Sequence, residues 1–190
     1  MGLDMYLERC NRKAWGYKGF DAEEVKANNP KLYEEMKPFL TVRGNYIQWE
    51  SIFEEVGYWR KANHIHRWFV ENVQDDVDDC GIYEVSKEQL ETLLSICKLV
   101  KSKCSLNEGV ITNGYRYENG VKIPMFEMGE YVANPAVAQE YLPTTDGFFF
   151  GSTDYDQYYM EDIEHTIEVL EKVLKETDFE NQIIAYSSSW

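Results

Sequence analysis

The sequence predicts a single α+β domain in which a small, mostly antiparallel sheet is packed by three main helices and carries an inserted hairpin. Three observations support this prediction. A chain of 190 residues suits one domain and can bury a core without disulfides or a metal. A period-two alternation at residues 3–8 predicts a first strand, and longer segments repeat apolar residues every three or four positions, as amphipathic helices do.

Two further extended segments are expected. Residues 42–53 are rich in Tyr, Ile and Trp, which favour strands, and residues 183–188 would form a closing strand. The Gly-Phe-Phe-Phe-Gly run at 147–151 predicts a buried strand or a packed turn. Between the first two strands, the charged stretch 21–37 is interrupted by Asn-Asn-Pro, so one or two short surface helices are expected there.

Three long helices follow from the apolar spacing. The first is expected over residues 58–73. Ser86 and Gln89 have the form of a capping box before a second helix whose apolar stripe runs to residue 100. Thr153 or Asp154 would cap a third helix, which has apolar residues from 159 to 174 on one face. A short helix is expected over 134–142, before a proline.

Residues 105–141 differ in character from the rest and are treated as a hairpin-containing insertion. Glycines become frequent, and Asn119-Gly120 lies between two short β-prone runs. Such a dipeptide is a strong signal for a tight hairpin turn.

The charge balance is strongly acidic. The chain has 19 Lys and Arg against 34 Asp and Glu, a formal net charge of −15. Such a field repels nucleic-acid phosphate and attracts a basic protein or a cation, although the charge alone could serve solubility. The four cysteines form no C-x-x-C pair, and no apolar run approaches the length of a membrane span, so a cytoplasmic protein without a cofactor is expected.

The histidines His64 and His66 have the H-x-H spacing that can chelate a metal on a strand. On the helix expected here, residues two apart point about 200° apart, so the two rings cannot share an ion. We expect His66 to flank the apolar face and be partly buried, and His64 and His165 to face solvent.

Asp75, Asp76, Asp78 and Asp79 form the densest charge cluster of the chain. A calcium loop beginning at Asp76 fails, because its fifth residue is a cysteine and its twelfth a lysine where a bidentate glutamate is needed. A solvated loop is the expected state, with a cation site as the alternative.

Asp154, Tyr155 and Asp156 form a second acidic segment. Its carboxylates could hold magnesium together with a substrate phosphate, but a helix N-terminus also favours acids without any ligand. Phosphate-binding, nucleotide-binding, serine-hydrolase and zinc-protease motifs are all missing from the sequence, so a non-catalytic protein is favoured over an enzyme.

Two blocks resemble a family of uncharacterised phage and prophage proteins: EVGYWRKANHIHRWFVENVQD at 55–75 and LPTTDGFFFGSTDYD at 142–156. The opening MGLDMYL and the closing SSW resemble that family too, and together the blocks cover about half of the chain. Residues 105–141 look like an addition to the family pattern, and Asp76 stands where that pattern has Gly. Small acidic phage proteins often bind host proteins, and the resemblance points to that class, which includes anti-CRISPR inhibitors.

The leading hypothesis is a non-catalytic, acidic, phage-encoded protein that antagonises a basic, nucleic-acid-handling host protein such as a CRISPR effector nuclease. It would act as a nucleic-acid mimic, bind no nucleic acid directly and lie in the host cytoplasm, with a homo-oligomer possible. The predicted contact residues are Asp75, Asp76, Asp78, Asp79, Asp154, Tyr155 and Asp156. The alternatives are a metal-dependent hydrolase or nuclease using both acidic clusters, and a structural phage accessory protein.

Overall fold

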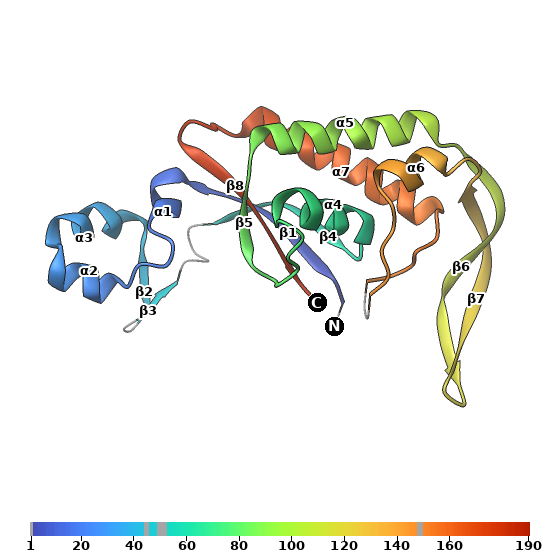
Figure 1. Ribbon diagram of the computed structural model, residues 1–190, viewed down its shortest axis with the longest axis horizontal. Coiled ribbons are helices and arrows are strands. Elements are labelled where there is room, and N and C mark those ends of the chain that lie inside the picture. Colours follow the sequence, from blue (N-terminus) through green and yellow to red (C-terminus); the bar gives the residue numbers. More distant parts are fainter. Residues whose placement is uncertain (1, 44–45, 49–52, 148–149) are drawn as a thin grey trace.

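The computed structural model describes residues 2–43, 46–48, 53–147 and 150–190 (Figure 1). The strands are β1 (Asp4–Asn11), β2 (Thr41–Arg43), β3 (Tyr46–Gln48), β4 (Glu54–Arg60), β5 (Ile82–Val85), β6 (Leu106–Glu118), β7 (Val121–Val132) and β8 (Gln182–Ser189). The helices are α1 (Arg12–Gly16), α2 (Ala22–Asn28), α3 (Pro30–Met36), α4 (Asn63–Val73), α5 (Lys87–Lys103), α6 (Ala136–Tyr141) and α7 (Gln157–Glu176), with a 3₁₀ turn η1 at Lys37–Phe39.

The central sheet has the strand order β4-β1-β8-β5, and every neighbouring pair is antiparallel. The first and last strands pair along their whole length, from Asp4 opposite Ser189 to Asn11 opposite Gln182. The two ends of the chain therefore lie side by side (Figure 1). The α+β prediction is confirmed, with α4, α5 and α7 as the three main helices.

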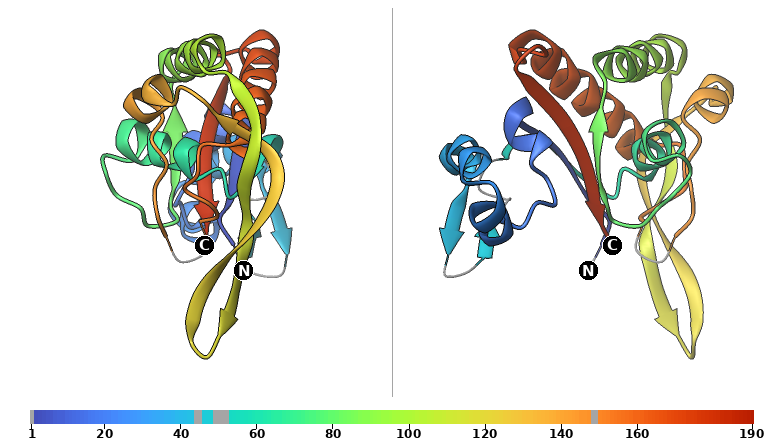
Figure 2. Two further views of the ribbon diagram at one scale, coloured as in Figure 1. Left: turned by 90° about the vertical axis from the view of Figure 1, so that its right-hand side faces the viewer. Right: turned by 60° about the vertical axis from the view of Figure 1, so that its left-hand side comes forward.

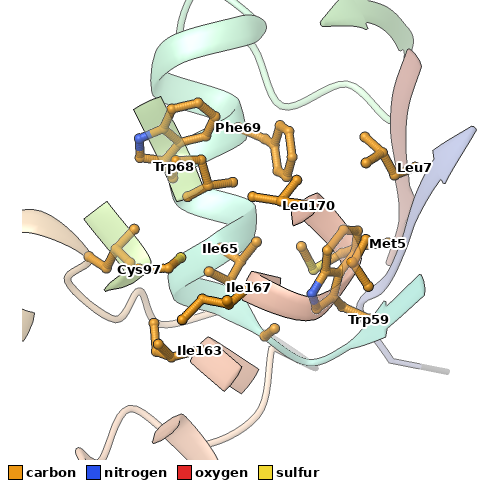
Figure 3. Packing of buried hydrophobic residues seen from close by; sticks show 14 of the residues in the cluster. Met5, Leu7, Trp59, Ile65, Trp68, Phe69, Cys97, Ile163, Ile167 and Leu170 are labelled. Carbon is orange, nitrogen blue, oxygen red and sulfur yellow. The ribbon is translucent and has the colours of Figure 1, made fainter. Parts of the chain in front are cut away.

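The main core lies between one face of this sheet and those three helices. Alternate residues of β1 and β8 point into it because side chains of a strand alternate between its faces, and Met5, Leu7 and Tyr186 are fully buried. Figure 3 shows Met5 and Trp59 of the sheet facing apolar residues of α4 and α7. A smaller cluster on the opposite face joins residues of β1 and β8 to Trp15 and Phe53.

The predicted helix over 58–73 begins five residues later than expected. Residues 54–60 form β4 instead, because they pair with the edge of β1, with Tyr58 opposite Tyr6 and Trp59 opposite Met5. Lys61, at φ 64°, ends the strand, and α4 then starts at Asn63. Pairing with β1 therefore outweighs the helical spacing of the apolar residues at the start of the predicted helix.

The capping box at Ser86 is confirmed: its side chain accepts from the backbone N–H of Gln89, whose side chain accepts from the N–H of Ser86. The third long helix is capped by Asp156 and not by Thr153 or Asp154. In the stretch 21–37, where one or two short helices were expected, there are two, α2 and α3. Strand β5, by contrast, was not anticipated, since it follows the acidic loop directly.

Strands β6 and β7 form a long hairpin that projects away from the rest of the molecule (Figures 1 and 2). Asn119 and Gly120 both have positive φ, 51° and 81°, the pattern that a tight two-residue hairpin turn needs. The predicted hairpin is thereby confirmed, and α6 follows within the short helix expected at 134–142.

Two other expectations concern segments only partly described. The extended segment expected at 42–53 contains the paired strands β2 and β3, while residues 44–45 and 49–52 of it lie outside the described residues. In the 147–151 run, residues 148–149 also lie outside them, and Phe150 is buried without belonging to a strand.

All four cysteines carry free thiols. Within the described part of the chain, no helix has the length and apolarity to cross a membrane.

Candidate functional site

A groove of about 470 Å³ lies between α4, the loop that follows α4, the loop between α6 and α7, and Trp190 at the end of β8. Three segments far apart in sequence therefore meet here. The lining residues of α4 fall in the block 55–75, those of the α6–α7 loop fall in the block 142–156, and Trp190 belongs to the closing SSW, while Asp76 and Asp78 lie just beyond the first block. The groove is the candidate functional site because it combines charged, aromatic and hydrogen-bonding side chains in one concave surface.

One buried asparagine holds the two walls of the groove together. Asn63, which is 1% exposed, donates from Nδ2 to the carbonyl oxygens of Phe150 at 3.1 Å and Ser152 at 2.7 Å. Its Oδ1 accepts from the backbone N–H of Thr145 at 3.0 Å. The loop between α6 and α7 is thus fixed to the start of α4, since a buried amide left without these partners would cost stability.

His66 forms the floor and is bonded through both ring nitrogens. Its Nδ1 lies 2.8 Å from the Tyr186 hydroxyl, and its Nε2 lies 3.0 Å from Oδ2 of Asp78. With Asp78 ionised, the tautomer protonated on Nε2 satisfies both contacts, because Nε2–H donates to the carboxylate and Nδ1 accepts from the tyrosine. Burial and the nearby Asp78 carboxylate raise the pKa of Tyr186 well above its usual value, which keeps that hydroxyl protonated.

Asp78 also receives a hydrogen bond from the other side of the groove. The indole Nε1–H of Trp190 donates to Oδ1 of Asp78 at 3.1 Å, and the ring of Trp190 packs edge-on against Phe150 with centroids 5.8 Å apart. One carboxylate therefore joins the acidic loop, α4 and the end of the chain. This contact makes Asp78 a structural residue of the groove as well as a charged one.

The remaining charges of the groove are unbalanced. Arg67 is engaged by Glu71 at 2.6 Å, so this cation is already neutralised locally. Asp76 and Asp146 line the groove, and neither carboxylate has a hydrogen bond or an ion pair among the described residues. Two free carboxylates beside two aromatic rings favour a cation with an apolar stem over an anion or a wholly apolar ligand.

In the first predicted acidic cluster, some carboxylates are free and others accept hydrogen bonds within the chain. Asp75 and Asp76 are exposed and have φ of 51° and 63°, a left-handed conformation that favours Gly. Asp78 is committed to His66 and Trp190. Asp79 closes the next turn, since its Oδ1 accepts from the N–H of Gly81 at 2.8 Å and from the hydroxyl of Tyr83 at 3.0 Å.

The second predicted acidic segment lies outside the groove. Asp154 is exposed, while Tyr155 is half-buried and packs against the ring of Tyr159. Asp156 is 2% exposed and caps α7, accepting through Oδ1 from the backbone N–H groups of Tyr158 and Tyr159. Burial raises the pKa of Asp156. In place of this segment, Asp146 and Trp190 line the groove together with Asp76 and Asp78 of the first acidic loop, and the charge pattern singled out neither of them.

The expected exposure of His64 is wrong. Its side chain is 3% exposed because α7 covers that side of α4, and its ring lies 4.2 Å from the ring of Tyr159. Burial lowers the pKa of His64 to about 3, so the ring is neutral. His165 is exposed as expected, with Nε2 2.9 Å from the carbonyl oxygen of Tyr58. Across the described residues, no group of three or more His, Cys, Asp or Glu is arranged to hold a metal ion.

Comparisons with known protein families, with curated proteins and with solved structures found no match to this chain. The likeness to phage and prophage proteins stays a prediction from the sequence blocks.

Proposed function

We propose that this protein is a non-catalytic interaction protein that binds and antagonises a basic, nucleic-acid-handling protein, and that its groove takes a Lys or Arg side chain of that partner. One observation carries the proposal: the unpaired carboxylates of Asp76 and Asp146 lie in the same groove as the aromatic rings of Phe150 and Trp190.

The groove chemistry matches such a side chain in two ways. The apolar stem of Lys or Arg packs on aromatic surface, and the charged end is attracted both by the ring faces and by carboxylates. Because the chain carries a net charge of −15, a basic partner is also attracted over longer distances, so association slows as salt is added.

The non-catalytic part of the proposal is supported by the state of His66, the histidine that lines the groove. Both of its nitrogens are held by Tyr186 and Asp78, so it has no free position with which to accept a substrate proton. A metal-dependent hydrolase would need both acidic segments around one or two cations, whereas Asp156 is engaged as a helix cap.

The anti-defence role, with a CRISPR effector nuclease as the partner, is the narrower form of the proposal. It rests on the resemblance of residues 55–75 and 142–156 to phage proteins and on the basic surfaces with which such nucleases hold nucleic acid. A protein that fills such a surface with carboxylates and aromatic rings would compete with the nucleic acid for it.

A charge-matched pair of variants tests the groove. The double change Asp76→Asn and Asp146→Asn removes two charges inside the groove, and Glu35→Gln with Glu168→Gln removes two exposed charges outside it. Affinity for a purified RNA-guided nuclease is measured by calorimetry at several salt concentrations. We expect about tenfold weaker binding for the groove variant than for the control, because an anchoring cation loses its partners.

Two results would overturn the proposal. Equal affinities for the two double variants would remove the groove as the contact surface. A wild-type chain that binds neither the nuclease nor other basic nucleic-acid-binding proteins, and does not compete with DNA for them, would remove the function.

A further inference from the structure

The hairpin formed by β6 and β7 exposes an apolar face. Val110, Phe126 and Met128 are 64%, 65% and 73% exposed, far more than the apolar residues of the core. Val110 is paired directly with Met128 and Thr112 with Phe126, in a register that runs unbroken from Leu106 to Thr112. Since side chains two apart on a strand share a face, these three residues form one cross-strand cluster.

The opposite face of the hairpin is already used to attach it to the body. Ile111 is buried and lies beside Gly129, where an added Cβ would come within 2.5 Å of Ile111 Cδ1 and 2.7 Å of Gln157 Oε1. Glu127 accepts from the hydroxyl of Tyr158 at 3.0 Å. The exposed cluster is therefore on the face that points away from α7.

A pair of like charges lies next to this cluster on the same face. Glu108 and Glu130 are directly opposite each other, one residue pair before Val110 and Met128 on that face. Neither carboxylate has an ion pair or side-chain hydrogen bond within the described ranges of the chain. Like charges directly opposite on a sheet are destabilising, so a cation placed between them would stabilise the hairpin.

We propose that this hairpin face, defined by Glu108, Val110, Phe126, Met128 and Glu130, docks a basic segment of a partner protein. The segment would place a Lys or Arg between the two glutamates and an apolar side chain about 7 Å away, the spacing of two residues along a strand. A second copy of this chain is disfavoured as the occupant, because symmetric stacking would bring four glutamates together between two chains of net charge −15. This surface shares no residue with the groove and does not depend on the function proposed for it.

Binding of designed peptides tests the charge and apolar requirements separately. The probe is an amphipathic peptide with a leucine stripe flanked by lysines. One control replaces its lysines by glutamates, and another replaces its leucines by serines. Backbone amide shifts of the isotope-labelled full chain should change in residues 106–112 and 126–132 with the first peptide and not with either control.

Protein variants then assign the contact. The double change Val110→Thr and Met128→Thr keeps strand-compatible residues and should weaken binding of the probe peptide about tenfold. The double change Glu108→Gln and Glu130→Gln should weaken this binding less, and should remove most of its salt dependence. The groove variant Asp76→Asn/Asp146→Asn should leave the hairpin shifts unchanged. Retained cross-strand contacts between β6 and β7 verify that each variant still forms the hairpin.

Three results would overturn the inference. The first is equal binding of the glutamate peptide, and the second is unchanged binding by the Val110→Thr/Met128→Thr variant. The third is concentration-dependent dimerisation that this variant abolishes, because the occupant would then be a second copy of the chain.

Discussion

Replacing Asp78 by Asn tests whether one carboxylate holds the candidate groove together. An asparagine can accept at only one of its two terminal atoms, so either the Nε2–H of His66 or the Nε1–H of Trp190 loses its acceptor. If His66 changes tautomer to compensate, its Nδ1–H must donate to the buried Tyr186 hydroxyl, which then loses its own acceptor. Each of these arrangements leaves one hydrogen-bond donor without an acceptor.

The cost follows from the type of hydrogen bond. Bonds to charged groups contribute roughly 1.5–3 kcal/mol each, and we expect a loss of about 2 kcal/mol because Trp190 is half-exposed. For a chain of 190 residues this corresponds to a fall of roughly 6 °C in melting temperature. Urea unfolding at pH 7, followed by tryptophan fluorescence, measures the difference directly.

The neighbouring Asp76→Asn change is the matched control. Asp76 is exposed and without a side-chain partner among the described residues, and asparagine tolerates its left-handed backbone, so its effect should stay within about 0.5 kcal/mol. Should the two variants unfold at the same urea concentration, the bridge from His66 to Trp190 would contribute nothing, and the proposed architecture of the groove would be refuted.

Three further predictions concern the core. Because His64 is neutral in the fold, with a pKa of about 3, and titrates near pH 6.5 when unfolded, its ring should disfavour the folded state by about 2 kcal/mol more at pH 5 than at pH 7. Urea titrations at both pH values should show this as a loss of about 2 kcal/mol in the wild type relative to His64→Phe. Burial and the nearby acids Glu161 and Asp156 raise the pKa of Asp162 to about 7, so the stability that protonated Asp162 contributes is lost as pH rises from about 4 to 7. Asp162→Asn should therefore be about 2 kcal/mol more stable than the wild type at pH 8. An equal or lower stability of the variant at that pH would contradict the raised pKa. Gly57→Ala would place a Cβ 2.6 Å from Val169 Cγ1 and should cost about 1–3 kcal/mol, most of it recovered in a double variant with Val169→Ala.

The main features of the fold could be predicted because they depend on local patterns. The capping box at Ser86, the Asn119-Gly120 turn and the apolar stripe of α7 each bury or satisfy groups within a few residues of each other. Strand β4 could not be predicted in this way. Its residues carry helix-compatible spacing, and only their pairing with β1, a segment about 50 residues away, makes them extended.

The candidate site was harder to predict than the fold. A run of acids identifies charge density but not which carboxylates remain free, and here Asp78, Asp79 and Asp156 are committed to hydrogen bonds within the chain. Asn63, which holds two walls of the groove together, and Trp190, which lines it, have no local signal, because their partners lie 82 or more positions away. His64 was misplaced for the same reason, since the ring that covers it comes from α7.

The distinction between committed and free carboxylates also separates two kinds of salt dependence. Hydrogen-bonded acids such as Asp78 act at short range in partly buried surroundings, where added salt has little effect, so they set stability. Free acids such as Asp76, Asp146, Glu108 and Glu130 act on an approaching partner through solvent, where a Debye length of about 8 Å at physiological salt limits their reach. Raising the salt concentration should therefore slow association with a basic partner without lowering the melting temperature, because salt also screens the repulsion among the surplus acids. If salt lowered both together, the groove would depend on its free charges for its shape, and the separation between its structural and its binding residues would not hold.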